Sequence, residues 1–327
     1  MARNYNICMF FHFRTVAISL FALTALAPLQ AQIYHAAEMN TEQLRGLDRA
    51  KTVVIIPGGI LEEHGPYIPS YTDGFVADRL AQEVANSIVE HGWTVLFMPP
   101  IPLGSGGANE LAGKYPFPGT YAVRVNTLRA VYMDLADELG EAGFKWIFLV
   151  HTHGAPNHNR ILDQAGAYFA EAYNGKMVHL TGFGIAGDDP HRTLTDKAKQ
   201  EDAGSGHAGI DETSEILFLR PDLVDPAYKG AKSFPAPGGD TAMIRVSKQP
   251  DWPGYFGAPQ YSSAEFGAKL FKSNATRMTQ QALAILDGAA PQNRPRGGPR
   301  PVDQEALSRD SAREQKQHDW LKKNGYE

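Results

Sequence analysis

Short, continuously apolar segments alternate with longer amphipathic segments through the first half of the chain. Runs such as VVII and IFLV are typical of strands that lie buried on both faces in a parallel sheet. Strands that alternate with helices predict an α/β fold, because the crossover helices then cover both faces of the sheet. The expected strands are residues 52–57, 94–99, 145–150 and 176–181, and the expected helices are residues 75–91, 126–143 and 157–173.

The first 31 residues have the pattern of a secretory signal peptide. Residues 15–27 form an apolar run of 13 that follows Arg14, and small and polar residues lead from it to Ala31. The run is shorter than the roughly 20 residues of a membrane-spanning helix. Cleavage near Ala31 removes Cys8, the single cysteine of the chain. We therefore expect a periplasmic or secreted protein without a membrane anchor after cleavage; an uncleaved anchor or a buried helix is the alternative.

The charge balance of the chain excludes two classes of partner. Residues 1–31 hold two of the 31 Lys and Arg residues and none of the 36 Asp and Glu residues, which leaves 29 against 36 and a net charge of −7 after cleavage. Binding to nucleic acid or to an anionic membrane requires a basic surface, so neither partner is expected.

One domain accounts for most of the exported chain. Residues 32–289 have a length typical of a single α/β domain. Residues 290–327 begin with Pro and Arg residues, which are typical of a linker, and continue as a charged stretch over residues 304–323. This stretch predicts a solvated or docking helix.

Potential metal ligands follow the predicted strands, at the edge where open α/β sheets bind their ligands. Glu62 and His64 come after the first strand, and their spacing directs both side chains to one side of an extended backbone. Asp73 follows them after a Gly- and Pro-rich turn, and His153 follows the third strand. His151 precedes His153 at the same spacing of two residues, and its role stays open.

A second segment adds His207 and Glu212, five residues apart, after the fourth strand. Imidazole and carboxylate groups are the ligands of zinc, manganese and iron hydrolytic sites, and a carboxylate such as Asp73 can bridge two ions. The clustering of these residue types at strand ends favours a catalytic metal site over isolated histidines. Glu63, Asp211 and Glu215 are expected to be solvated or to cap helices. The remaining histidines of the exported chain show no pattern of potential ligands around them in the sequence: His35, His91, His158, His179, His191 and His318.

These blocks, in this order, resemble the creatininase (creatinine amidohydrolase) family. The resemblance covers about residues 40–285. It rests on Pro57-Gly58-Gly59, Glu62-Glu63-His64-Gly65, Ile68-Pro69, Thr72-Asp73, Pro118-Gly119-Thr120, the segment from His151 to Asn157, the segment from His207 to Ser214, and the segment from Gly254 to Pro259.

The resemblance implies a three-layer α/β/α fold with a mostly parallel central sheet, commonly assembled into a homo-oligomer. It also implies a centre of two divalent ions, Zn²⁺ or Mn²⁺ with Fe²⁺ as an alternative, that hydrolyses a C–N amide bond. By position, Glu62 and His153 would hold one ion, His64 would hold the other, and Asp73 would bridge them. Glu212 would be a further ligand or the general base. His207 would protonate the leaving nitrogen or polarise the carbonyl group.

Several departures from the family pattern bear on the substrate. Creatininase carries a carboxylate ligand where Ala155 stands, the family asparagine is replaced by His151, and Pro156 resembles an insertion. His151 or Glu212 would then supply the missing ligand, or one ion would bind weakly. Residues 184–206 contain no Trp where creatininase places tryptophans against creatinine, so creatinine is not the expected substrate. Residues 103–119, rich in Gly and aromatic residues, predict a pocket wall or a surface loop.

Three functions are consistent with this pattern. The first is an exported metal-dependent amidohydrolase that acts on a small cyclic or formyl-type amide. The second is a metallopeptidase that trims a peptide, and the third is a metal-binding protein whose catalytic ligand set has decayed at Ala155. The pair His207 and Glu212 favours an enzyme, because a binding protein has no need of an acid and a base beside the ions.

Overall fold

The computed structural model describes residue 1 and residues 31–106, 118–181, 188–203, 206–238, 240–291 and 304–326. The predicted signal peptide, almost all of the predicted linker and most of the predicted pocket wall lie outside these residues. In the described part of the chain, no helix combines the length and the apolar character that a bilayer crossing requires.

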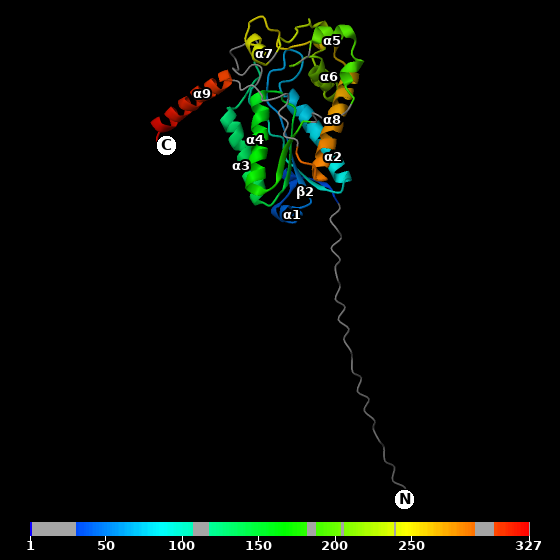
Figure 1. Cartoon of the computed structure of the whole chain (residues 1–327), viewed down its shortest axis with the longest axis vertical. Helices are drawn as coiled ribbons and strands as arrows, with labels where there is room; N and C mark the ends of the chain where they lie inside the picture. Colours follow the sequence, from blue (N-terminus) through cyan, green and yellow to red (C-terminus); the bar gives the residue numbers. More distant parts are fainter. Residues whose placement is uncertain are drawn as a thin grey trace. The chain divides into compact units, whose positions relative to one another are not determined.

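A sheet of five parallel strands forms the centre of the described structure, in the order β1-β3-β2-β4-β5 (Figure 1). Four of these strands were predicted to within two residues at each end. Strand β1 was not predicted, because its three residues are too few to show a periodic pattern. The strands are β1 (Ile33–His35), β2 (Thr52–Gly58), β3 (Thr94–Phe97), β4 (Trp146–His151) and β5 (Lys176–Leu180).

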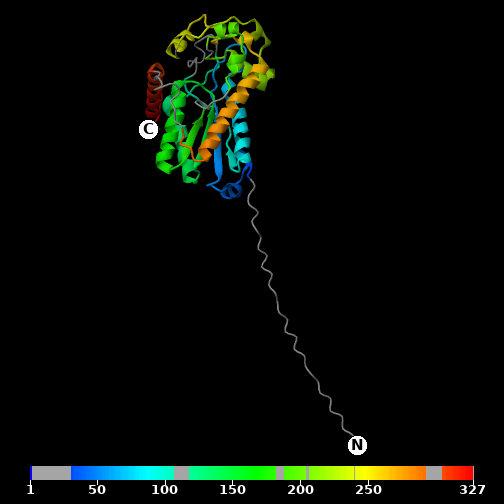
Figure 2. The same ribbon diagram turned by 45° about the vertical axis from the view of Figure 1, so that its right-hand side comes forward.

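Helices cover both faces of the sheet, which confirms the predicted three-layer architecture. Helices α2 (Thr72–Glu90) and α8 (Ala264–Leu286) pack on one face, and α3 (Val125–Glu141) and α4 (Pro156–Tyr173) pack on the other (Figure 2). Alternate residues of β2 enter different cores: Val53 contributes to the core under α2 and α8, and Val54 to the core under α3 and α4. Both side chains are fully buried, as the apolar runs predict.

The order of the strands creates a crevice between β2 and β4. From β2 the chain passes through α2 to β3 on one side, and it then returns through α3 to β4 on the other side of β2. The helices that follow two neighbouring strands therefore lie on opposite faces. Such a switch in direction leaves room for a ligand at the carboxyl ends of the strands.

Helix α6 (Ile210–Leu219) is held close to α8 by a glycine. A Cβ atom at Gly267 of α8 would lie 1.9 Å from the carbonyl oxygen of Ser214 in α6, a distance that no real contact reaches. Only glycine permits this approach. The contact fixes the height of α6 above the sheet and with it the position of Glu212 in the first turn of α6.

The remaining elements are short, apart from the C-terminal helix α9, which spans the charged stretch for which a helix was predicted. Asp310 of α9 accepts a hydrogen bond of 2.6 Å from the backbone N–H of Val125 at the start of α3. These elements are α1 (Thr41–Arg45), α5 (Asp196–Asp202), α7 (Asp240–Val246), α9 (Gln304–Lys323), η1 (Ala36–Glu38), η2 (Pro190–Thr193), η3 (Pro221–Leu223), η4 (Pro226–Gly230) and η5 (Pro259–Tyr261).

Candidate metal centre

The loop after β2, the start of α2 and the loop after β4 bring Glu62, His64, Asp73 and His153 to the carboxyl end of the sheet. The loop after β2 carries Glu62 and His64 and is folded back on itself, because the N–H of Glu62 donates to the carbonyl oxygen of Ser70 at 2.9 Å. Asp73 lies in the first turn of α2. The hydroxyl group of Thr152, just after β4, donates to the backbone oxygen of Asp73 at 2.9 Å. This bond joins the start of α2 directly to the loop after β4.

A first group of ligand atoms consists of Glu62, Asp73 and His153. The Nδ1 atom of His153 lies 3.2 Å from Glu62 Oε2 and 3.0 Å from Asp73 Oδ2, and all three side chains are almost fully buried. Asp73 Oδ2 and His153 Nε2 are buried without a hydrogen-bond partner. Carboxylate and imidazole atoms that converge in a buried space fit a divalent cation, because they are the donor atoms that such ions prefer.

A second group consists of His64, Asp73 and Glu212. His64 Nδ1 lies 3.0 Å from the carbonyl oxygen of Glu62, so we assign the ring proton to Nδ1. The lone pair on His64 Nε2 then points into the site, 3.6 Å from Glu212 Oε2 and 3.9 Å from Asp73 Oδ1, and this atom has no hydrogen-bond partner. A histidine ligand that donates its other N–H to a carbonyl group is typical of metal sites. Asp73 belongs to both groups, as a bridging ligand must.

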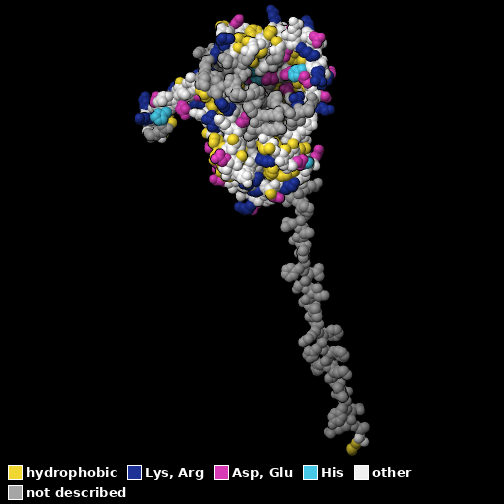
Figure 3. All heavy atoms as spheres, in the orientation of Figure 1, with side chains coloured by type: hydrophobic (Ala, Val, Ile, Leu, Met, Phe, Trp, Pro, Cys, Tyr) yellow, Lys and Arg dark blue, Asp and Glu magenta, His cyan; other side chains and the backbone are white. Residues whose placement is uncertain are grey.

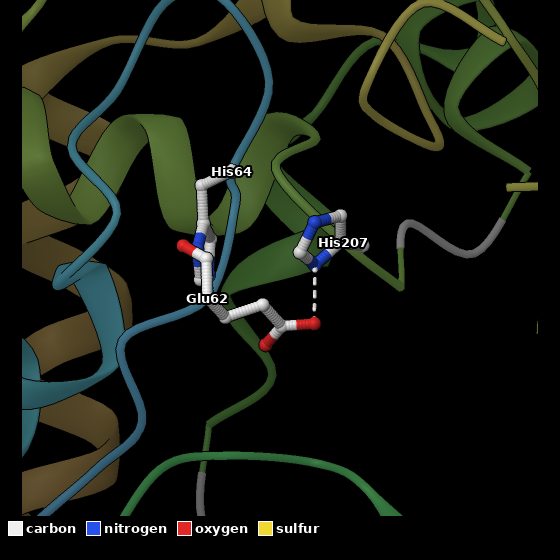
Figure 4. Close-up of side chains that lie close together, drawn as sticks. All are labelled: Glu62, His64 and His207. Atoms are coloured by element: carbon white, nitrogen blue, oxygen red, sulfur yellow. Dashed lines mark hydrogen bonds and ion pairs between the residues drawn. The ribbon is translucent and has the colours of Figure 1, made fainter. Parts of the chain in front are cut away.

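His207 lies beside these groups, and with Glu62 and His64 it forms a third group of atoms that could hold an ion. Figure 4 shows its imidazole ring facing Glu62 and His64, which come from the β2 loop. Its Nδ1 atom is 3.8 Å from Glu62 Oε1, and its ring centroid is 4.6 Å from that of His64. The other nitrogen, Nε2, lies 3.0 Å from Glu63 Oε1. The candidate acid thus contacts both the ligand cluster and a carboxylate outside it.

The electrostatics of the centre follow from the burial of opposite charges together. Burial alone would raise the pKa of Glu62 and lower those of His153 and His207, but their mutual attraction reverses each effect. The pKa of Glu62 is therefore lowered, that of His153 is raised well above its usual range, and that of His207 is raised to about 10. Burial raises the pKa of Glu212, although His64 and His207 oppose this change.

The expectation that Glu63 is solvated or caps a helix was wrong. The residue is only 2% exposed, and both of its carboxylate oxygens have partners, His207 and the N–H of Gly65. Nothing in the sequence around Glu63 distinguishes it from a surface acid next to a ligand. Its burial is decided by a segment far along the chain, since Thr120 Oγ1 accepts a bond of 3.0 Å from the N–H of Glu63.

His151, whose role the sequence left open, does not approach the ligand groups of the described residues. Its Nδ1 lies 3.1 Å from Nε2 of His158 and its Nε2 lies 2.9 Å from the hydroxyl group of Tyr132, all within the protein interior. Burial lowers the pKa of His151 to about 3, so the ring is neutral. A Cβ atom at Gly58 would lie 2.4 Å from this ring, which explains the glycine there. Among the described residues, Glu212 and not His151 joins His64 and Asp73 in a group that could hold an ion.

Other side chains for which solvation or no partner was expected also have partners. Glu215 is buried and accepts a hydrogen bond from Asn274. Burial, together with the charges of Asp211 and Glu212, raises the pKa of Glu215 to about 8. His158 and His179 lie in the interior beside His151, and His179 Nε2 donates to the carbonyl oxygen of His151 at 3.2 Å. His91 contacts Asp287. His191 contacts Asp189 and Asp211.

A cavity of about 180 Å³ opens beside the two ligand groups. In Figure 3, acidic side chains lie inside a recess at the end of the molecule that carries α5, α6 and α7. Gly106 lines the cavity, so the described part of the segment 103–119 contributes to its wall. Four other lining residues are ionisable side chains of the centre: Glu62, His153, His207 and Glu212. The rest are uncharged: Gly154, Ala155, Pro156, Gly206, Met243 and Phe256.

Comparisons with known proteins agree with this geometry. The model of the creatininase family, described as creatinine amidohydrolase, matches residues 37–282. A mycofactocin precursor peptide peptidase of Mycolicibacterium smegmatis is 26% identical over 250 residues, which cover 71% of this chain and 85% of the relative. A creatinine amidohydrolase of Pseudomonas putida is 28% identical over 180 residues, which cover 53% of this chain and 66% of that enzyme.

Solved creatininases share the fold at lower identity. A tryptophan-to-phenylalanine mutant creatininase superposes with a TM-score of 0.60 at 22% identity, over 78% of this chain and 99% of its own. A creatininase described as the Mn form gives a TM-score of 0.52 at 20% identity, with coverage of 78% and 99%. A mutant described as the Zn-Zn type gives 0.54 at 21% identity, with coverage of 78% and 98%.

The ion pair of His191 with Asp211 predicts a pH-dependent contribution to stability. The hydrogen bond with Asp211 outweighs burial and raises the pKa of His191 from 6.5 to about 9. A raised pKa stabilises the fold fully below the unfolded value and loses this effect as the pH rises through the folded value. In urea unfolding, the His191→Gln variant should therefore be more destabilised, relative to the parent protein, at about pH 6 than at about pH 10.

The double variant Asp189→Asn/Asp211→Asn provides the control. His191→Gln added to it should cost little stability at either pH, because both carboxylates that contact the imidazolium ion have been replaced by neutral amides. Equal destabilisation by His191→Gln at both pH values would show that packing, not charge, accounts for the effect of His191.

Proposed function

Because the chain belongs to the creatininase family of metal-dependent amidohydrolases, we propose that it hydrolyses the C–N bond of a small cyclic or formyl-type amide at a centre of two divalent ions. The observation that carries this proposal is the pair of ligand groups that share Asp73. Each group contributes one imidazole and two carboxylates, and each contains buried atoms without a hydrogen-bond partner. Bound ions would give these buried atoms a coordinating partner.

In this proposal Glu62 and His153 hold one ion, His64 and Glu212 hold the other, and Asp73 bridges the two. Glu212 takes the place of the ligand that Ala155 does not provide. Each ion thus keeps three protein ligands, the number found in catalytic zinc sites. Oxygen and imidazole donors suit Zn²⁺ and Mn²⁺, and Fe²⁺ is the alternative. This ligand set argues against a decayed, non-catalytic centre.

The residues around the ions have separate tasks. Two bound ions would supply Lewis acidity to the amide carbonyl group and would lower the pKa of water towards neutrality. Glu212, whose side chain is 28% exposed, borders the cavity where the amide would lie. His207 also lines the cavity, and its Nδ1 atom faces the ligand cluster. It is the group placed to give a proton to the leaving nitrogen.

The size of the cavity supports a small substrate. About 180 Å³ is less than the roughly 300 to 1,000 Å³ of pockets that enclose drug-sized ligands. Its apolar lining by Ala155, Met243 and Phe256 suits a neutral, compact group. The resemblance to precursor peptide peptidases makes a peptide the second candidate substrate.

Metal analysis tests the centre itself. Mature protein purified without chelator is expected to contain close to two transition-metal ions per chain, and Asp73→Ala should lose most of both because it removes the bridge. Glu212→Gln should keep about one ion, because the group of Glu62, Asp73 and His153 stays intact. Glu215→Gln, a change in a buried acid outside both groups, is the matched control and should keep two.

Other results of the metal analysis have defined meanings. Two ions in Glu212→Gln would make Glu212 the general base instead of a ligand. No bound metal in the parent protein, even after reconstitution with zinc and manganese, would contradict the proposed hydrolase.

A panel of amides tests the reaction. The metal-loaded protein is expected to hydrolyse hydantoin or an N-formyl amino acid faster than creatinine, and EDTA should abolish the activity because the ions supply the Lewis acid. His207→Ala should lower kcat by roughly 100-fold, the usual contribution of a general acid. Faster release of C-terminal residues from a pentapeptide than of product from any small amide would favour the metallopeptidase.

We also propose that the protein is exported and cleaved near Ala31. The backbone oxygen of Gln32 accepts a hydrogen bond of 3.0 Å from the N–H of Val95, so a chain that begins at Gln32 retains its contact with the sheet. Cell fractionation and intact mass of protein expressed in a Gram-negative host should find a chain that starts at Gln32 in the periplasm. Leu20→Arg, which interrupts the apolar run, should keep the full chain in the cytoplasm. Full-length parent protein in the cytoplasm would contradict export.

A further inference from the structure

Both carboxylate oxygens of Glu63 have a polar partner. Its Oε1 lies 3.0 Å from His207 Nε2 and its Oε2 accepts a hydrogen bond of 3.1 Å from the N–H of Gly65. Its side chain is 1% exposed. It belongs to none of the three groups that could hold a metal ion. This buried charge therefore needs another explanation, since a buried carboxylate is costly unless its contacts compensate.

A distant segment holds Glu63 in place. Thr120 accepts a hydrogen bond from the backbone N–H of Glu63, and a Cβ atom at Gly119 would lie 3.4 Å from Glu63 Cα. Gly119 has a φ of +139°, which favours glycine. The Pro-Gly-Thr block of the sequence thus positions the backbone from which the Glu63 side chain reaches His207.

The imidazole of His207 is held on its remaining sides as well. Its ring stacks on Trp252 with an interplanar angle of 28°, and its backbone oxygen accepts a hydrogen bond of 2.8 Å from the N–H of Phe256. The contact with the Glu63 oxygen keeps a proton on Nε2, whether or not Nδ1 carries one, because a carboxylate oxygen accepts the hydrogen bond. Nδ1 is then the nitrogen that faces Glu62, and His207 is one of the residues that line the cavity.

We propose that Glu63 is a positioning residue that orients the imidazole of His207, with Nε2–H bound to Glu63 and Nδ1 directed at the substrate. The inference rests on the proposed function, in which His207 gives a proton to the leaving nitrogen. The proton leaves from Nδ1 as the C–N bond breaks, and Nε2 keeps its proton and its bond to Glu63. A carboxylate that orients a catalytic histidine in this way selects the correct tautomer.

The variant Glu63→Gln separates this role from packing, because it keeps the size and shape of the side chain. A glutamine amide has one oxygen and one NH₂ group, whereas His207 and Gly65 both require an acceptor. If the oxygen faces Gly65, the NH₂ group faces His207 Nε2 and displaces its proton. The opposite orientation would set the NH₂ group against the N–H of Gly65 and would require the loop to shift, so we expect the first orientation.

Long-range ¹H–¹⁵N NMR spectra of zinc-loaded protein with labelled histidine measure this effect without a substrate. In the parent protein Nε2 of His207 should be protonated, with the signals assigned by their loss in His207→Gln. In Glu63→Gln the protonation pattern of His207 should change, while the zinc content stays the same as in the parent. Glu215→Gln is the matched control, and it should leave the His207 signals unchanged.

Kinetics with the panel amide that the parent protein hydrolyses fastest add a second measurement. Glu63→Gln should lower kcat by about 100-fold and change KM less than about threefold, because binding does not need the tautomer but proton transfer does. Unchanged His207 signals in Glu63→Gln would overturn the proposal, and so would loss of zinc in that variant alone. Absence of zinc from the parent as well would instead contradict the proposed function, and the NMR comparison would still decide the role of Glu63.

Discussion

The burial of several carboxylates in one small space is the constraint on which the rest of this structure depends. Glu62, Glu63 and Asp73 are each at most 3% exposed, and they come from a stretch of 12 residues. Like charges this close repel strongly in a medium of low dielectric constant. Imidazole rings from the loop after β4 and from the loop before α6 offset part of this repulsion. Divalent cations would offset the remainder.

The order of the strands makes such a centre possible. Strands β3 and β4 are added on opposite sides of β2, so the helices that follow β2 and β4 cover opposite faces of the sheet. The loops after β2 and β4 therefore border an open crevice that no helix fills. The buried strands below are apolar on both faces and supply a rigid base. Helix α6 then closes the centre from above, at a height set by the contact of Gly267 with Ser214. The buried strands on one side and helix α6 on the other keep the ligand atoms within the small positional tolerance that metal coordination requires.

The departures from the family pattern change the centre without removing it. The side chain of Ala155 has no ligand atom. Glu212 Oε2 lies 3.6 Å from His64 Nε2, and both residues belong to the second group of potential ligands. His151 stands where the family has asparagine, and it turns away from the centre to bond His158 and Tyr132. The cavity next to Ala155 is lined by Met243 and Phe256 as well as by side chains of the centre.

The sequence by itself determined the layers, most strands and the chemical type of the centre, because apolar periodicity and ligand spacing are local properties of the chain. It also identified Glu62, His64, Asp73, His153, His207 and Glu212, which the structure brings together. The tertiary structure alone decided which neighbours of these residues matter. Glu63 and His151 both lie within two residues of a candidate ligand, yet one contacts the candidate acid and the other faces the interior. That difference is set by Thr120 and Tyr132, residues remote in the chain, and local patterns carry no information about such contacts.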